Sequence, residues 1–140
     1  MRRIDDIFPQ LGFVPALILV IVFGVALELS GAWVTMLVAG ALGALFVRKA
    51  KRAFLVGFLG VGIAWTLLFA YLVLTAHALE VANFFIGLLG ASGLGALVIV
   101  ISVIIGALLG GFGGLLGRTT IELIDGLISR PAQEKAPASE

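Results

Sequence analysis

Long apolar runs alternate with short polar breaks along this chain. Glu28 is the only charged residue between positions 11 and 47, and Glu80 is the only one between positions 53 and 117. A basic stretch at residues 48–52 separates the two apolar halves. Because roughly 20 apolar residues in a helix cover the ~30 Å hydrocarbon core of a bilayer, this pattern is typical of membrane-spanning helices.

The apolar runs predict four transmembrane helices, at residues 11–29, 32–47, 53–76 and 94–116. The last run is too long for one straight span, because the 34 residues from 84 to 117 would form a helix of about 51 Å. Four glycines between positions 87 and 95 favour a break near residues 90–93. We therefore predict a short interfacial or re-entrant segment before the fourth span, and the alternative is one strongly tilted helix.

A C-terminal helix outside the membrane is predicted at residues 119–130. Thr119 and Glu122 match a capping box, in which a hydroxyl at the N-cap is followed three residues later by a carboxylate. Apolar residues then recur at helical spacing, which is typical of an amphipathic helix on a membrane surface. Residues 131–140 consist of Ala, Pro, Ser, Gln and charged residues and are predicted to be a disordered tail. Residues 1–118 would form the transmembrane domain.

Composition agrees with an all-α integral membrane protein. Hydrophobic residues make up 61% of the 140 residues and charged residues 12%, whereas soluble domains carry about 25% charged residues. The chain has no cysteine, so disulfides and thiolate metal sites are excluded.

The basic residues predict the orientation. With four spans and a cytoplasmic N-terminus, all nine Lys and Arg residues lie on the cytoplasmic side, as the positive-inside rule requires. We expect a multi-pass protein of the cytoplasmic membrane with both termini inside. The loop residues Arg48, Lys49, Lys51 and Arg52 are predicted topology determinants, and the alternative is that they bind anionic lipid head groups.

Glycines supply the most specific signal in the spans. Gly106, Gly110 and Gly114 recur every fourth residue and share one helix face, and Gly57 and Gly60 lie in the third span. Small residues at this spacing let two helices approach at backbone distance. The face is predicted to pack either against the third span of the same chain or against another chain in an oligomer.

Three polar residues form a candidate site near the outer ends of the predicted spans: Glu28, His77 and Glu80. Carboxylates and an imidazole together bind metals, relay protons or hydrogen-bond a quinone head group. The alternative is that they are ordinary polar residues at span ends. No catalytic, cofactor-binding or metal-binding residue is predicted, because nucleophile, HExxH and P-loop patterns are absent from the sequence.

These observations favour a non-enzymatic function. We expect an accessory or structural subunit of a membrane complex, or a self-assembling oligomer, with the lipid bilayer and other membrane subunits as partners and no nucleic acid. The alternative is an oligomeric channel, pore or small-solute transporter. A membrane enzyme subunit that uses the polar candidate site is the third hypothesis.

Overall fold

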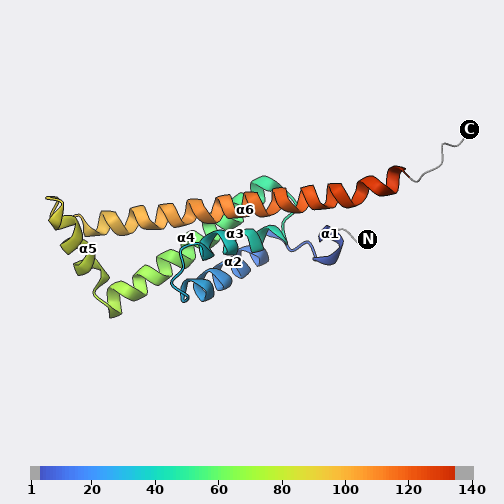
Figure 1. The fold of residues 1–140 in the computed structure, drawn as a ribbon. Coiled ribbons are helices and arrows are strands. Elements are labelled where there is room, and N and C mark those ends of the chain that lie inside the picture. Colours follow the sequence, from blue (N-terminus) through green and yellow to red (C-terminus); the bar gives the residue numbers. More distant parts are fainter. Residues whose placement is uncertain (1–3, 135–140) are drawn as a thin grey trace, which may run out of the picture.

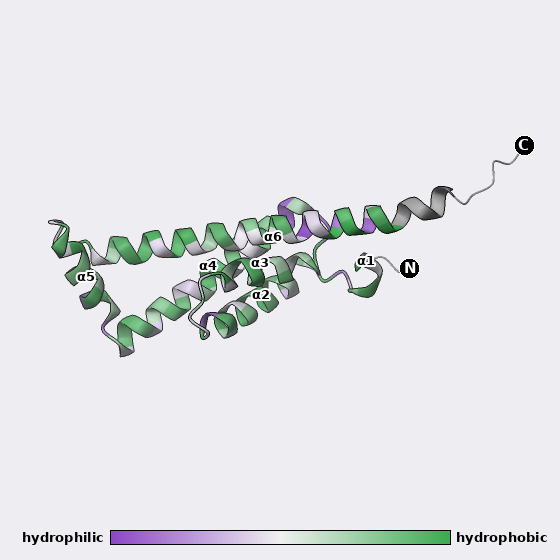
Figure 2. Ribbon diagram, in the orientation of Figure 1, coloured by the Kyte–Doolittle hydropathy of each residue, from purple (hydrophilic) through white to green (hydrophobic). Residues whose placement is uncertain are grey.

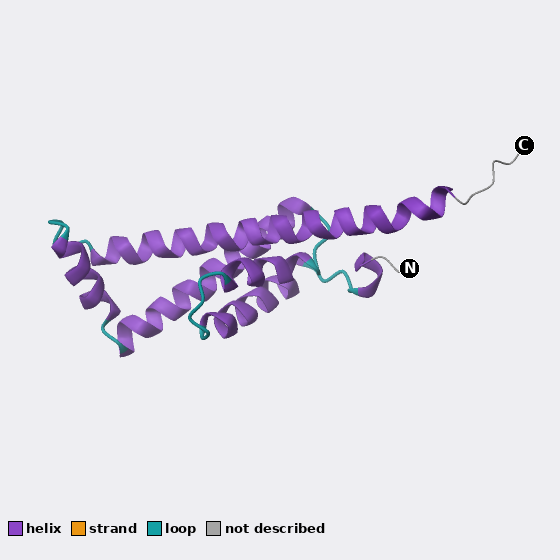
Figure 3. Cartoon of the chain, in the orientation of Figure 1, coloured by secondary structure: helices purple, strands orange, loops and turns teal. Residues whose placement is uncertain are grey.

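The computed structural model describes residues 4–134, apart from the side chains of Asp6 and of residues 129–134. All regular structure in this range is helical (Figures 1 and 3). Six helices follow one another along the chain: α1 (Ile4–Ile7), α2 (Phe13–Glu28), α3 (Thr35–Ala44), α4 (Ala50–Thr75), α5 (Ala78–Leu88) and α6 (Gly95–Glu134).

The long helix α6 organises the fold. Its 40 residues extend about 60 Å, and α3 and α4 pack along it (Figure 1). The hairpin of α2 and α3 covers the part of α4 and α6 that lies nearer α1. Beyond the hairpin, α4 diverges from α6, and α5 bridges the gap between their ends (Figure 1). We call the two ends of the bundle the α1 end and the α5 end.

Two helices are long and apolar enough to cross a membrane, rather than the four predicted. They are α4 and the Gly95–Ile128 part of α6. The predicted spans at 11–29 and 32–47 contain shorter helices of 16 and 10 residues. The remaining apolar residues form turns, one of which includes Gly31 at φ 72°.

The predicted break before the last span is present. Helix α5 ends at Leu88, and α6 begins at Gly95 after a turn in which Gly90 and Gly93 have φ values of 82° and 84°. Glycine enters this left-handed region without the steric cost of a Cβ atom. The alternative of one tilted helix over the whole run is therefore wrong.

The predicted C-terminal surface helix is not a separate element. Residues 119–130 continue α6 without a break, so Thr119 is not an N-cap. The hydroxyl of Thr120 donates to the carbonyl of Leu116 at 2.8 Å, and Glu122 pairs with Arg118. The predicted disordered tail overlaps α6 at residues 131–134, and residues 135–140 lie outside the described part.

Small residues at the helix crossings bring the backbones together. A Cβ atom built on Gly110 would lie 2.6 Å from the carbonyl oxygen of Gly57 on α4, and one built on Gly40 of α3 would overlap the backbone of Gly110. On the other side of α4, Gly60 leaves room for the side chain of Val20 from α2. Glycines thus permit the close packing of α3 and α4 against α6.

The outward faces of the helices remain apolar. Ile18 on α2, Leu67 on α4 and Ile105 on α6 are each more than half exposed, and hydrophobic residues predominate along these helices (Figure 2). A helix that is hydrophobic on all sides requires an apolar environment on the side that its own chain does not cover.

Candidate functional site

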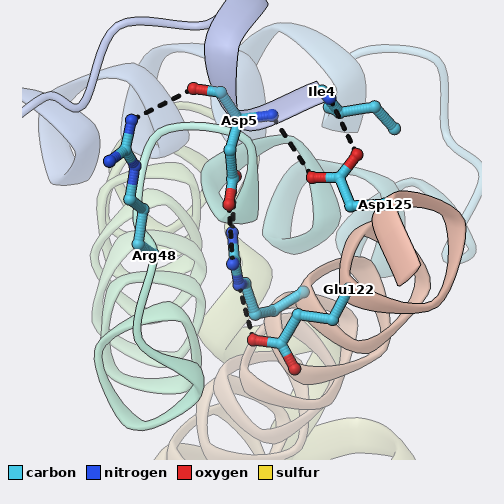
Figure 4. Close-up of polar contacts among 6 residues, drawn as sticks. Ile4, Asp5, Arg48, Glu122 and Asp125 are labelled. Carbon is cyan, nitrogen blue, oxygen red and sulfur yellow. Dashed lines mark hydrogen bonds and ion pairs between the residues drawn. The ribbon is translucent and has the colours of Figure 1, made fainter. Parts of the chain in front are cut away.

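A buried arginine is the centre of a polar cluster at the α1 end. Arg118 of α6 is only 6% exposed. Its Nη1 and Nη2 atoms donate to the two carboxylate oxygens of Asp5 at 2.8 and 2.9 Å, and its Nε donates to Glu122 at 2.8 Å (Figure 4). A planar guanidinium matches a carboxylate in this two-bond geometry, so α1 is attached to α6 at this point.

Two further contacts attach α1. The carboxylate of Asp125 accepts hydrogen bonds from the backbone N–H groups of Ile4 at 2.8 Å and Asp5 at 3.5 Å. The first N–H groups of a helix have no partner within the helix, so this carboxylate caps α1. Arg48, which precedes α4, donates to the backbone carbonyl of Asp5 at 3.1 Å (Figure 4). We call these six residues the α1–α6 cluster: Ile4, Asp5, Arg48, Arg118, Glu122 and Asp125.

The electrostatics of the cluster favour a charged Asp5. Hydrogen bonds from Arg118 lower the pKa of Asp5, although partial burial raises it, and the positive charges of Arg118 and Arg48 lower it further. The carboxylate is therefore ionised over the physiological pH range and remains paired. The charged groups of this cluster engage one another, so the geometry supports attachment of α1 rather than a reaction.

Sequence reasoning selected only Arg48 from this cluster. Asp5 and Arg118 are 113 positions apart, and neither stands out in its own segment. One local signal was present, because Glu122 follows Arg118 by four residues, the spacing at which helical side chains meet. The sequence interpretation instead paired Glu122 with Thr119, three residues before it, as a capping box.

The three polar residues predicted as a candidate site do not come together in the structure. His77 and Glu80 lie 3.4 Å apart, with both side chains at least three-quarters exposed. Glu28 does not lie beside them. Gly24 of α2 packs against Ala64 of α4, and α2 ends about one turn later at Glu28, whereas α4 continues to Thr75 before the chain reaches His77. In the described part of the chain, no three His, Cys, Asp or Glu residues are placed to hold a metal ion.

The glycine face of α6 is occupied within the chain. Gly106 lies under the ring of Trp65, Gly110 meets Gly57, and Gly114 meets the backbone of Ala53, all on α4. Gly60 does not share this contact, since it faces Val20 of α2 instead. The basic residues Lys49, Lys51 and Arg52 are exposed at the start of α4.

An apolar cleft lies between α4 and α6 toward the α5 end. Its volume is about 380 Å³. Phe69, Ala70 and Val73 line it from α4, and Ile99, Val103 and Ile104 line it from α6. The shape of this cleft depends on the angle at which the two helices diverge (Figure 1).

Comparisons of the chain with protein-family models, with curated proteins and with solved structures found no match.

Proposed function

We propose that this chain is a multi-pass protein of the cytoplasmic membrane with α2, α3, α4 and α6 in the bilayer and both termini in the cytoplasm. The length and apolar character of α4 and α6 support this placement. Arg48, just before α4, and Arg118 of α6 both contact α1, so these two of the basic residues that the positive-inside rule assigns to the cytoplasm lie at the same end of the bundle. The α2–α3 hairpin enters and leaves the membrane from that end.

Its role, in this proposal, is non-catalytic. The chain acts as an accessory or structural subunit of a membrane complex or as a self-assembling oligomer. The observation that carries this proposal is the apolar surface of α5, which buries none of its residues within the chain. Phe84, Phe85 and Leu88 are each 63–69% exposed, and exposed apolar patches of this kind mark sites of association with proteins or membranes.

The polar groups of the long helices give less support to a pore within one chain. Thr66 donates its hydroxyl to the carbonyl of Gly62, and Ser102 donates to that of Val98, so each is satisfied by its own helix. A pore would therefore have to form between several copies. The exposed His77–Glu80 pair gives equally little support to a membrane enzyme subunit.

Light scattering on the protein in lipid nanodiscs tests the role of α5. We expect the wild-type chain to have a mass above that of one chain, and the double variant Phe84→Ser, Leu88→Ser to fall toward the single-chain mass with unchanged helix content. The control is Leu123→Ser, which removes a similarly exposed apolar side chain from the opposite end of α6. A single-chain mass for the wild type, or an assembly that survives the α5 substitutions, would contradict self-assembly through α5.

A further inference from the structure

The cleft between α4 and α6 is a wedge. The helices touch at backbone distance where Gly57 meets Gly110. One turn nearer the α5 end, the ring of Trp65 lies against Gly106 and packs edge-on against Phe69, with ring centroids 5.2 Å apart. The change from glycine to aromatic residues separates the helices, and α5 joins their separated ends (Figure 1).

The lining of the wedge excludes a polar occupant. Every side chain around it is apolar except that of Thr66, and the Thr66 hydroxyl already donates to the carbonyl of Gly62. A polar ligand would lose its hydrogen bonds to water without replacement, which costs several kcal/mol. Ordered water would likewise find no partners in the wedge. The occupant must be apolar.

The shape of the wedge favours a flexible apolar chain over a helix as its occupant. The lining runs from Thr66 to Val73 on α4, a distance of about two helical turns. A helix is a rigid cylinder about 10 Å wide and cannot follow walls that converge to the backbone contact between Gly57 and Gly110. A hydrocarbon chain is thinner than a helix and adapts to the narrowing shape.

Charge at the mouth of the wedge distinguishes between lipid classes. Between positions 76 and 94, Glu80 is the only charged residue, and His77 pairs with it. A carboxylate without a nearby Lys or Arg in this segment repels an anionic head group and attracts the positively charged ammonium group of a zwitterionic one. The basic residues that suit anionic lipids lie at the other end, where α4 begins.

We infer that the α4–α6 cleft binds one acyl chain of a zwitterionic phospholipid, with the head group beside His77 and Glu80. This inference rests on the proposed placement of the chain in a membrane. The bound chain would fill the wedge that the protein leaves open and would restore the dispersion contacts of its walls.

Tryptophan fluorescence tests the inference, because the chain has only Trp33 and Trp65. Trp33→Phe leaves Trp65 as a reporter that packs against Phe69 of the cleft wall. The purified variant is placed in phosphatidylcholine with brominated acyl chains, which quench a nearby indole, and its emission is compared with that in unbrominated lipid. We expect quenching of Trp65 that falls at least about twofold when Val103→Phe fills the cleft, since van der Waals contact is short-ranged.

The matched control is Ile105→Phe. This residue lies about 170° around α6 from the centre of the lining face and is exposed, so its replacement adds bulk without entering the cleft and should leave the quenching of Trp65 unchanged. Ala70→Phe fills the cleft from α4 and should repeat the effect of Val103→Phe if that variant does not fold. Equal quenching in cleft-filled and control variants would overturn the inference.

The reciprocal variant Trp65→Phe separates this inference from the membrane placement. Trp33, in the α2–α3 turn, is 65% exposed and should be quenched by bulk lipid. Absence of quenching at both tryptophans would refute the membrane placement, whereas quenching of Trp33 without a cleft-dependent effect at Trp65 would refute only the lipid site.

Native mass spectrometry of the wild-type protein gives an independent measurement. After release from nanodiscs of equal phosphatidylcholine and phosphatidylglycerol content, we expect one retained phosphatidylcholine per chain, lost in Val103→Phe and kept in Ile105→Phe. Retention of phosphatidylglycerol at the cleft would refute the assignment of head-group charge. A second protein chain whose binding Val103→Phe abolishes, with no lipid retained, would show that a protein occupies the cleft instead.

Discussion

Arg118 and Asp5 bring opposite charges together where water is scarce. Taking both groups out of water is costly, and the attraction between them compensates only when the geometry is good and the remaining donors have partners. Here the geometry is bidentate, and Glu122 accepts the hydrogen bond from Nε. Removing one partner leaves the other charge without compensation, so the pair makes the position of α1 specific.

The acid sensitivity of this pair can be measured. Because the folded state lowers the pKa of Asp5 below its ordinary value of 3.8, the pair stabilises the fold fully above that pH, and this contribution is lost as the pH falls through the lowered pKa. We expect Asp5→Asn to destabilise the protein at pH 7 by about 1.5–3 kcal/mol, the usual worth of a hydrogen bond to a charged group. Thermal unfolding in a zwitterionic detergent should show this loss.

The same comparison at acid pH supplies the control. Well below pH 3.8, wild-type Asp5 becomes protonated, so the wild type and Asp5→Asn should unfold at nearly the same temperature. A difference that persists undiminished in acid would mean that the ionised carboxylate is not the source of the stability.

At this scale the sequence predicted little of the site. The apolar pattern is a property of neighbouring residues, whereas the Asp5–Arg118 contact depends on how α1 folds back onto the end of α6. Glu28 shows the same limit: it lies at the end of a helix, as the apolar pattern indicated, but the length of α2 keeps it away from His77 and Glu80.

Among the elements, α6 shows both what a local pattern predicts and where it fails. The glycines at residues 90–93 indicated the start of the helix correctly, because positive φ values are a local requirement. The boundary predicted at Thr119 was wrong, since Thr and Glu three residues apart also fit inside a helix. Arg118, four residues before Glu122, stabilises the continuous form through its ion pair.

Two glycines of α6 provide a matched test of helix packing. A Cβ atom at Gly110 would lie 2.6 Å from the carbonyl oxygen of Gly57, whereas one at Gly126 would meet nothing within 4 Å. We expect Gly110→Ala to destabilise the fold by roughly 1–3 kcal/mol, the usual cost of overpacking. Gly126→Ala should stabilise α6 by up to about 1 kcal/mol, because alanine has the higher helix propensity.

Thermal unfolding followed by circular dichroism measures both variants. Opposite signs are the expected result. Stabilisation by both substitutions would mean that α4 does not approach α6 closely at Gly110. The cleft between these helices would then not narrow to a backbone contact.

For the whole molecule, the order of elements along α6 determines how the chain would lie in a membrane. The α1–α6 cluster and the start of α4 are at one end, and α5 is at the other (Figure 1). Between these ends, the Gly95–Ile128 part of α6 and the Ala50–Thr75 helix α4 are apolar enough to cross a bilayer. The two ends should therefore lie on opposite sides.

Single cysteines report the side on which each end lies, because the natural chain has none. Ala50 and Ser92 are suitable positions, since Ala50 begins α4, Ser92 lies in the turn before α6, and both are exposed. The basic residues around Ala50 oppose translocation, whereas the α5 end has no Lys or Arg to retain it. In intact cells, an impermeant maleimide should label Ser92→Cys and leave Ala50→Cys unlabelled until the membrane is permeabilised.

A third position, Ala138→Cys near the C-terminus, should behave as Ala50→Cys does. Labelling of Ala50→Cys and Ala138→Cys from outside, with Ser92→Cys protected, would invert the orientation but keep α4 and α6 as spans. Equal labelling of all three positions in intact cells would instead mean that the chain does not cross the membrane. In that case the exposed apolar faces of α4 and α6 would have to be covered by other protein chains, since water is a poor solvent for surfaces of this kind.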